Sequence, residues 1–66
     1  MIKLTKLNGS DIYINPDLMS NMECHPNTTI HMTTGEKIIV QEPPEKVIEH
    51  VIEFKRKIFL KHLNGG

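Results

Sequence analysis

The chain has 66 residues, with four His, one Cys, eight basic and eight acidic side chains, so its formal net charge is zero. This length allows one domain, because domains typically contain roughly 100 to 150 residues. A single Cys excludes an intramolecular disulfide and a multi-Cys zinc site. Zero net charge argues against a general polyanion binder. We expect one domain over residues 1–66, and domains this small often oligomerise.

Residues 1–41 carry the pattern of short strands. Asn8-Gly9 favours a hairpin with a type I′ turn, in which both central residues have positive φ. Within residues 18–25 we expect the even positions, including Cys24, to point inward. Apolar and polar residues alternate in five runs, and turn residues separate them: 2–5, 11–14, 18–25, 29–33 and 36–41. The pattern predicts a small antiparallel β-meander of about five strands.

The periodicity then changes to that of a helix. Glu42-Pro43-Pro44-Glu45 is a helix-start signal, since proline fits the first turn and acids complement the dipole. Two apolar rows follow at helical spacing: Val47, Val51, Phe54 and Ile58, and beside them Ile48, Ile52 and Phe59. The sequence therefore predicts an α+β fold with one long C-terminal amphipathic helix over about 44–63 and a frayed end at 64–66.

The predicted helix is longer than the sheet that should cover it. A strand of five or six residues spans roughly 17 to 20 Å, whereas a helix of 20 residues spans about 30 Å. The last turns should therefore overhang with exposed apolar surface, which typically marks self-association or a partner site. We expect this interaction face to contain Phe54, Ile58, Phe59 and Leu63.

The zero net charge is divided between two parts of the chain. Residues 1–54 hold eight acids and four Lys, which gives 4 − 8 = −4, and residues 55–66 hold four cations and no acid, which gives +4. The cations form a predicted basic patch of Lys55, Arg56, Lys57 and Lys61. The patch has two interpretations: cations suit a helix C-terminus, or they steer an acidic protein surface or anionic lipid.

The residues that could carry chemistry do not form a recognisable site. Cys24, His25 and His31 could approach one another across a hairpin, but neighbours on a strand face opposite sides, and a soft-donor metal site needs three or four ligands. We expect Cys24 to fill the core. We expect no catalytic residue, no metal, no cofactor and no enzymatic activity.

The first residues do not resemble a targeting segment. Met1-Ile2-Lys3-Leu4-Thr5-Lys6 lacks the apolar run of about 7 to 15 residues that a signal peptide needs. The longest apolar runs contain three residues, at 38–40 and 58–60, whereas a spanning helix needs about 20. We expect a cytoplasmic protein without a membrane span.

The turn residues, taken together, resemble a known family. The matching positions are, in order, Leu4, Leu7-Asn8-Gly9, Tyr13, Asn15-Pro16-Asp17-Leu18, Glu23, Pro26-Asn27-Thr28, Ile30, Gly35, Val40 and Glu42. This order, followed by an amphipathic helix, resembles the small FlbD flagellar family, whose swarming-motility members are called SwrD. The resemblance covers about residues 1–60. It departs at Pro26-Asn27-Thr28, where the family usually has Pro-Asp-Thr.

The resemblance implies a bacterial protein needed for full flagellar motor power in swarming, through the stator or the basal body at the inner membrane. Combined with the overhang, it favours a non-enzymatic interaction protein that works as a homo-oligomer. An alternative is a small RNA-binding regulator, because the β-rich chain with a terminal helix also resembles the carbon storage regulator proteins in outline. Those proteins bind RNA through basic strands, whereas the strands here are acidic overall, so nucleic acid is the less favoured partner.

Overall fold

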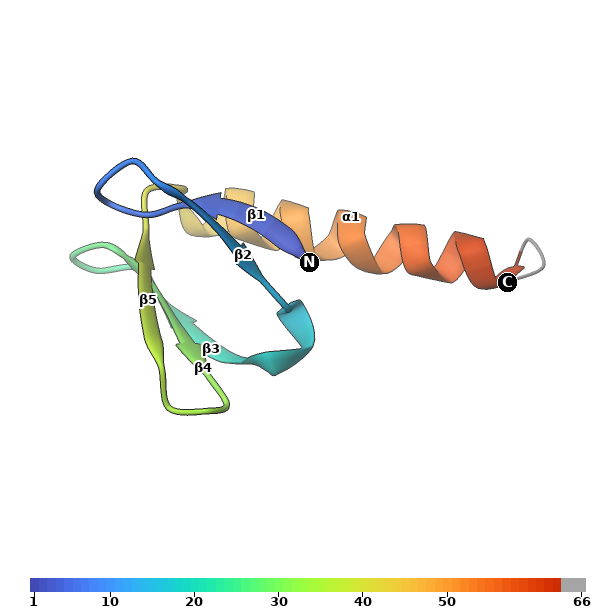
Figure 1. Ribbon diagram of the computed structural model, residues 1–66, viewed down its shortest axis with the longest axis horizontal. Coiled ribbons are helices and arrows are strands. Elements are labelled where there is room, and N and C mark those ends of the chain that lie inside the picture. Colours follow the sequence, from blue (N-terminus) through green and yellow to red (C-terminus); the bar gives the residue numbers. More distant parts are fainter. Residues whose placement is uncertain (64–66) are drawn as a thin grey trace.

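The computed structural model describes the backbone of residues 1–63 and the side chains of residues 1–61. Over these residues it contains five strands followed by one long helix (Figure 1). In chain order the elements are β1 (Ile2–Thr5), β2 (Asp11–Ile14), the 3-10 turn η1 (Pro16–Leu18), β3 (Met19–Glu23), β4 (Thr28–Met32), β5 (Lys37–Val40) and α1 (Pro44–Leu63). The α+β prediction and the predicted helix bounds are confirmed. The predicted frayed end at 64–66 lies outside the described residues.

The strands form two antiparallel sheets, β1-β2 and β3-β4-β5. The break falls at η1, where Pro16 interrupts the backbone and the Asn15 side chain accepts a hydrogen bond of 3.0 Å from the Asp17 N–H. The two sheets meet where Lys6 pairs with Val40 in an isolated antiparallel bridge. Next to it the Gln41 N–H donates to the Thr5 carbonyl at 2.8 Å. The end of β1 therefore continues the second sheet beside β5, and the strands curve around a shared interior.

The β1–β2 and β4–β5 hairpin loops use glycine in the same way. In the first, Lys6 N–H donates to the Ser10 carbonyl and Gly9 N–H to the Lys6 carbonyl, each at 2.9 Å. The loop that ends at Gly35 repeats this pattern. The φ angles are +90° at Gly9 and +95° at Gly35, and no other described residue has a positive φ. The expected type I′ turn is therefore wrong: a three-residue loop lets glycine alone adopt the left-handed conformation, as in a type I turn followed by a bulge.

Seven aliphatic side chains make the buried core. They come from both sheets and from α1: Ile2, Leu4, Ile14, Ile30, Ile38, Val40 and Val47. The alternation predicted for β1, β4 and β5 is confirmed, since Ile39, for example, faces outward between Ile38 and Val40. The core is therefore a small aliphatic cluster to which the helix contributes one fully buried residue, Val47.

The orientation expected for residues 18–25 is wrong in part. The register of β3 against β4 shifts between Met19 and Asn21, and a bulge of this kind changes which side chains face inward. Met19 and Met22 consequently pack against the core, whereas Leu18 is exposed in η1. Strand β3 ends at Glu23, so Cys24 lies in the following turn and is exposed. The expectation that Cys24 fills the core is thus overturned.

Glu42 fastens the start of α1 to β1. Its carboxylate accepts two hydrogen bonds of 2.9 Å, from the Thr5 N–H and from the Thr5 hydroxyl. Burial acts to raise the pKa of Glu42, but the Thr5 hydrogen bonds, its own backbone N–H and the charge of His50 outweigh burial and hold the pKa below its ordinary value of 4.5. The sequence placed Glu42 in the helix-start signal and among the family positions, but assigned it no contact. Its contact with Thr5, 37 positions away, depends on the tertiary fold.

Substitution Gly35→Ala should lower the free energy of unfolding by about 1 kcal/mol, because a Cβ disfavours the left-handed conformation. No atom lies within 4 Å of the position that this Cβ would occupy, so the effect is conformational and not steric crowding by neighbours. Gly35→Asn should cost less, since Asn tolerates this conformation better. Urea denaturation measures both, and an Ala variant as stable as the Asn variant would contradict the assignment.

Substitution Glu42→Gln should lower the free energy of unfolding near neutral pH by about 1 kcal/mol, the net worth of a typical hydrogen bond. Because the folded-state pKa is lowered, the stabilisation is complete above the unfolded value of 4.5 and is lost as pH falls through the folded value. The difference between wild type and variant should therefore shrink in acid. Denaturation at several pH values measures it, with Glu36→Gln in an exposed turn as the control. A difference that does not change with pH would contradict the ionised contact.

Candidate interaction surface

Helix α1 has an attached half and a free half. In the attached half Val47 is fully buried, and Val51 and Phe54 pack partly buried against the core. Every described side chain after Phe54 is exposed. Length explains the division, because β1 has four residues and spans roughly 13 Å, whereas the 20 residues of α1 span about 30 Å. Figure 1 shows the helix continuing far beyond the strands.

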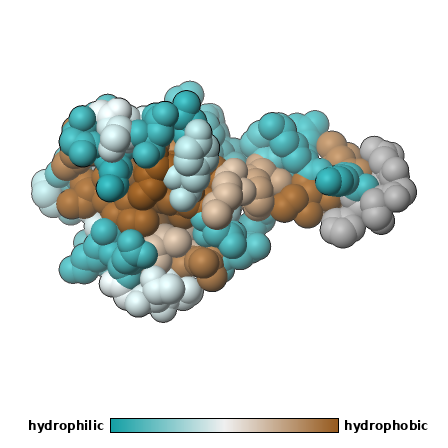
Figure 2. All heavy atoms as spheres, in the orientation of Figure 1, coloured by the Kyte–Doolittle hydropathy of each residue, from teal (hydrophilic) through white to brown (hydrophobic). Residues whose placement is uncertain are grey.

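We call residues 55–61 the overhang. It exposes three large apolar side chains, Ile58, Phe59 and Leu60. Figure 2 shows apolar surface on the part of the helix that extends beyond the β body. The overhang predicted from element lengths is therefore present. Phe54, which we expected on the interaction face, lies in the attached half against the core. The Leu63 side chain lies outside the described side chains.

A second apolar row runs along both halves of α1. We call Ile48, Ile52 and Phe59 the second row, and their exposed fractions are 48%, 61% and 61%. Successive helix residues are rotated by about 100°, so this row faces well away from the row of Val47, Val51 and Phe54 that packs on the core. From the sequence we expected exposed apolar surface only on the last turns of the helix, beyond the sheet. The spacing between the two rows could have predicted the exposure of the second row, because a body this small covers one row and leaves the other uncovered.

The charges on α1 change sign along its length. Residues 45, 49 and 53 are Glu, whereas the basic patch of Lys55, Arg56, Lys57 and Lys61 lies entirely on the overhang and is exposed. Lys46 forms an ion pair of 3.4 Å with Glu49, within the attached half. Among the described residues no ion pair involves the basic patch. These cations are therefore available to an outside partner.

The side chains considered for chemistry do not converge. The His31 imidazole Nε2 lies 2.9 Å from Glu23 Oε1 on the neighbouring strand, and both residues are near the surface. Cys24 and His25 are exposed in the turn between β3 and β4. The described part of the chain contains no group of three or more His, Cys, Asp or Glu placed to hold a metal ion.

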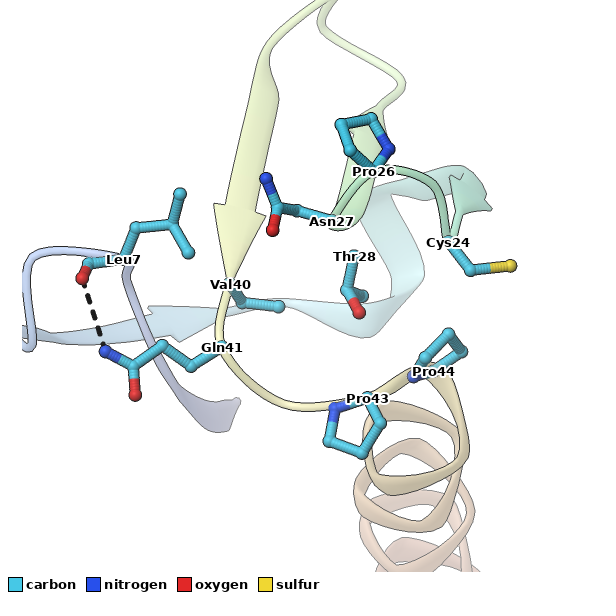
Figure 3. Close-up of a pocket in the computed structure, with 9 residues that line it drawn as sticks. All are labelled: Leu7, Cys24, Pro26, Asn27, Thr28, Val40, Gln41, Pro43 and Pro44. Atoms are coloured by element: carbon cyan, nitrogen blue, oxygen red, sulfur yellow. Dashed lines mark hydrogen bonds between the residues drawn. The ribbon is translucent and has the colours of Figure 1, made fainter.

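A shallow hollow of about 410 Å³ lies between the β3–β4 turn and the start of α1 (Figure 3). Pro26, Pro43 and Pro44 contribute to its wall, and Gln41 at its edge donates a hydrogen bond of 3.3 Å to the Leu7 carbonyl. Cys24 is the only titratable side chain among the described residues that line it, and Figure 3 shows its sulfur pointing outward. The hollow thus lacks the acid, base and nucleophile arrangement of a catalytic site.

The fold and this surface define a small α+β domain with a projecting basic and apolar helix. Residues 1–59 match the family described as "FlbD: Flagellar and Swarming motility proteins", and the chain belongs to this family. The resemblance inferred from the turn residues is confirmed. The protein therefore has a role related to flagella or swarming, and FlbD is not a known enzyme family.

Comparisons with curated proteins and with solved structures give no match. No helix within residues 1–63 has both the length and the apolar character that a membrane crossing requires.

Substitution Val47→Ala should lower the free energy of unfolding by about 2 kcal/mol, because it removes buried methyl groups and leaves a cavity. Leu60→Ala should change it by less than about 0.5 kcal/mol, since Leu60 is exposed on the overhang and Ala is a good helix former. Urea denaturation of both variants tests the division of α1. Equal losses of stability would show that the overhang packs on the body.

Proposed function

We propose that the protein is a non-enzymatic accessory protein of the flagellar motor that supports motor power during swarming. The observation that carries the proposal is the overhang, which presents apolar and cationic side chains that its own fold leaves uncovered, in a chain of a flagellar and swarming family. Exposed apolar surface rimmed by polar residues marks sites of protein association. A binding role therefore fits this chain better than a catalytic one.

The partner that suits the overhang is an acidic surface of the stator or the basal body. Ile58 and Phe59 supply apolar anchors of the kind that dominate binding energy. The basic patch surrounds them and would raise the association rate with an acidic partner. The protein would then be cytoplasmic and recruited to the basal body at the inner membrane.

Self-association belongs to the same proposal. A chain of 66 residues buries only about 60% of the surface that its unfolded form exposes, and here the core contains seven buried aliphatic residues. Small domains without disulfides commonly gain stability by oligomerising. We infer that the working form is a homo-oligomer, with the uncovered faces of α1 supplying the additional buried area.

The alternative of an RNA-binding regulator receives less support from the placement of charge. Strands β1 and β5 each contain one Lys, whereas four of the eight basic side chains lie on the overhang. The single Tyr and two Phe supply few rings for base stacking. Retardation of RNA that weakens steeply with salt would favour the alternative over a motor protein.

A strain that lacks the gene should swarm poorly and produce less motor torque, and the wild-type gene should restore both. The gene carrying Ile58→Ser together with Phe59→Ser should restore them poorly, because the apolar anchors are removed from an exposed segment that does not hold the body together. Swarm expansion and tethered-cell rotation measure the effect, and immunoblotting checks protein level. A crosslinking pull-down from swarming cells should recover stator or basal-body proteins.

The matched control is Tyr13→Ser, which removes an exposed aromatic side chain from β2 and leaves α1 unchanged. This control should restore swarming fully. Normal swarming and torque in the deletion strain would count decisively against the proposed function. Full restoration by the Ile58 and Phe59 variant would exclude the overhang as the working surface.

A further inference from the structure

The second row of α1 is an apolar face that the chain's own body leaves uncovered. Ile48, Ile52 and Phe59 follow one side of the helix over three turns, and each is about half or more exposed. The first two lie in the attached half, so helix length alone does not explain their exposure. A helix that packs on both of two apolar rows needs a neighbour on each side. The β body fills one side and leaves the second row for another molecule.

We propose that a second copy of this chain covers the second row, with the two α1 helices antiparallel about a two-fold axis. The inference rests on the self-association in the proposed function and names the face and the orientation that produce it. A two-fold contact uses the same patch on both copies. A two-fold axis that passes between the two helices, level with the midpoint of Lys55 and Arg56, places Ile52 of each copy opposite Phe59 of the other, since each lies three and a half positions from that level.

Charge decides in favour of the antiparallel orientation. Residues 45–54 hold three Glu and one Lys, a sum of −2, whereas residues 55–61 hold four cations and no acid, a sum of +4. Antiparallel helices lay the acidic half of each copy along the basic half of the other. Parallel helices would instead place four cations beside four cations, which is destabilising. The arrangement also brings Lys57 and Lys61 near Glu53 and Glu49 of the other copy, while Lys55 and Arg56 lie close to the axis.

The same symmetry accounts for the exposed first row on the overhang. A two-fold axis of this kind keeps the two β bodies on the same side of the helix pair. The body of one copy then lies beside the overhang of the other, on the side where Ile58 extends the row of Val47, Val51 and Phe54. The dimer therefore buries Phe59 of the overhang, while the first row of the overhang lies at the edge of the contact.

Lys55 lies close to the proposed axis and faces its counterpart. The methylene stem of Lys55 can pack along the apolar row while its ammonium group reaches water, so the contact tolerates this residue. The two like charges of Lys55 and its counterpart nevertheless weaken the dimer. Replacing it with an apolar residue should tighten the dimer. If the second row instead bound an anionic bilayer, the same substitution should weaken binding, because it removes a cation.

The first test is the mass of the full chain by light scattering over a range of protein concentrations. Wild type should have twice the mass of the 7.6 kDa chain. Phe59→Asp and Ile52→Asp should each weaken dimerisation by about tenfold or more, because they place a charge in the apolar contact. Tyr13→Asp is the matched control, with a ring exposed by 63% against 61% for Phe59 but located on β2. Lys55→Leu should tighten the dimer, and circular dichroism confirms that each variant retains its helix.

The second test fixes orientation by disulfide formation in a Cys24→Ser background, which removes the native exposed thiol. An equal mixture of Ile52→Cys protein and Phe59→Cys protein should form disulfide-linked pairs several-fold faster than either protein alone. In the antiparallel pair two copies of position 52 are seven residues apart along the axis, about 10 Å, beyond the roughly 7 Å between Cα atoms that a disulfide spans.

Three results would overturn the inference. They are a wild-type chain that stays monomeric, a dimer that Phe59→Asp and Ile52→Asp leave unchanged, and faster crosslinking by Ile52→Cys protein alone, which indicates parallel helices. A monomeric wild type that sediments with vesicles containing phosphatidylglycerol would assign the face to lipid instead. A monomeric wild type would also refute the self-association in the proposed function, whereas the role in the motor is decided separately by the motility of the deletion strain.

Discussion

The feature on which the rest of the structure depends is a mismatch of length between one helix and the strands beside it. Helix α1 has 20 residues, whereas each strand has four or five. The seven-residue aliphatic core accepts only the first half of the helix, through Val47 with support from Val51 and Phe54. The remaining turns therefore project from the body (Figure 1). The exposed apolar side chains and the cations of the overhang both result from this projection, whereas Ile48 and Ile52 are exposed because the body covers only one row of the helix.

The body fixes the position from which the helix projects. Glu42 joins the last turn before α1 to Thr5 on β1, and the Gln41 N–H bonds to the Thr5 carbonyl one residue earlier. These contacts hold the chain between β5 and α1 against the first sheet, in the region where Lys6 also pairs with Val40. A helix held at its start and packed over its first half presents its second half in a defined direction. Such preorganisation reduces the entropy lost on binding.

This arrangement suits a protein that acts by contact in a flagellar and swarming family. The described side chains that could take part in catalysis or metal binding lie apart from one another. His31 contacts Glu23, Cys24 lies in a turn, and Glu42 holds the start of the helix. The basic patch, which forms no ion pair among the described residues, and the exposed apolar side chains of the overhang lie together on α1. The inferred dimer buries Phe59 with the rest of the second row. A motor partner that binds the dimer would therefore use Ile58, Leu60 and the basic patch at the edge of the contact.

Sequence alone determined the class of fold, the helix from Pro44 to Leu63, the positions of the glycine turns and the family. These features follow from local periodicity, turn chemistry and element lengths, all of which depend on residues that are close together in the sequence. The tertiary structure decided the division into two sheets, the exposure of Cys24, the Glu42 contact with Thr5 and the exposure of Ile48 and Ile52. Each of these features depends on which distant segment packs against the residue concerned. A single-residue bulge in β3, or the small width of the body, changes which side chains are buried without changing the local sequence pattern.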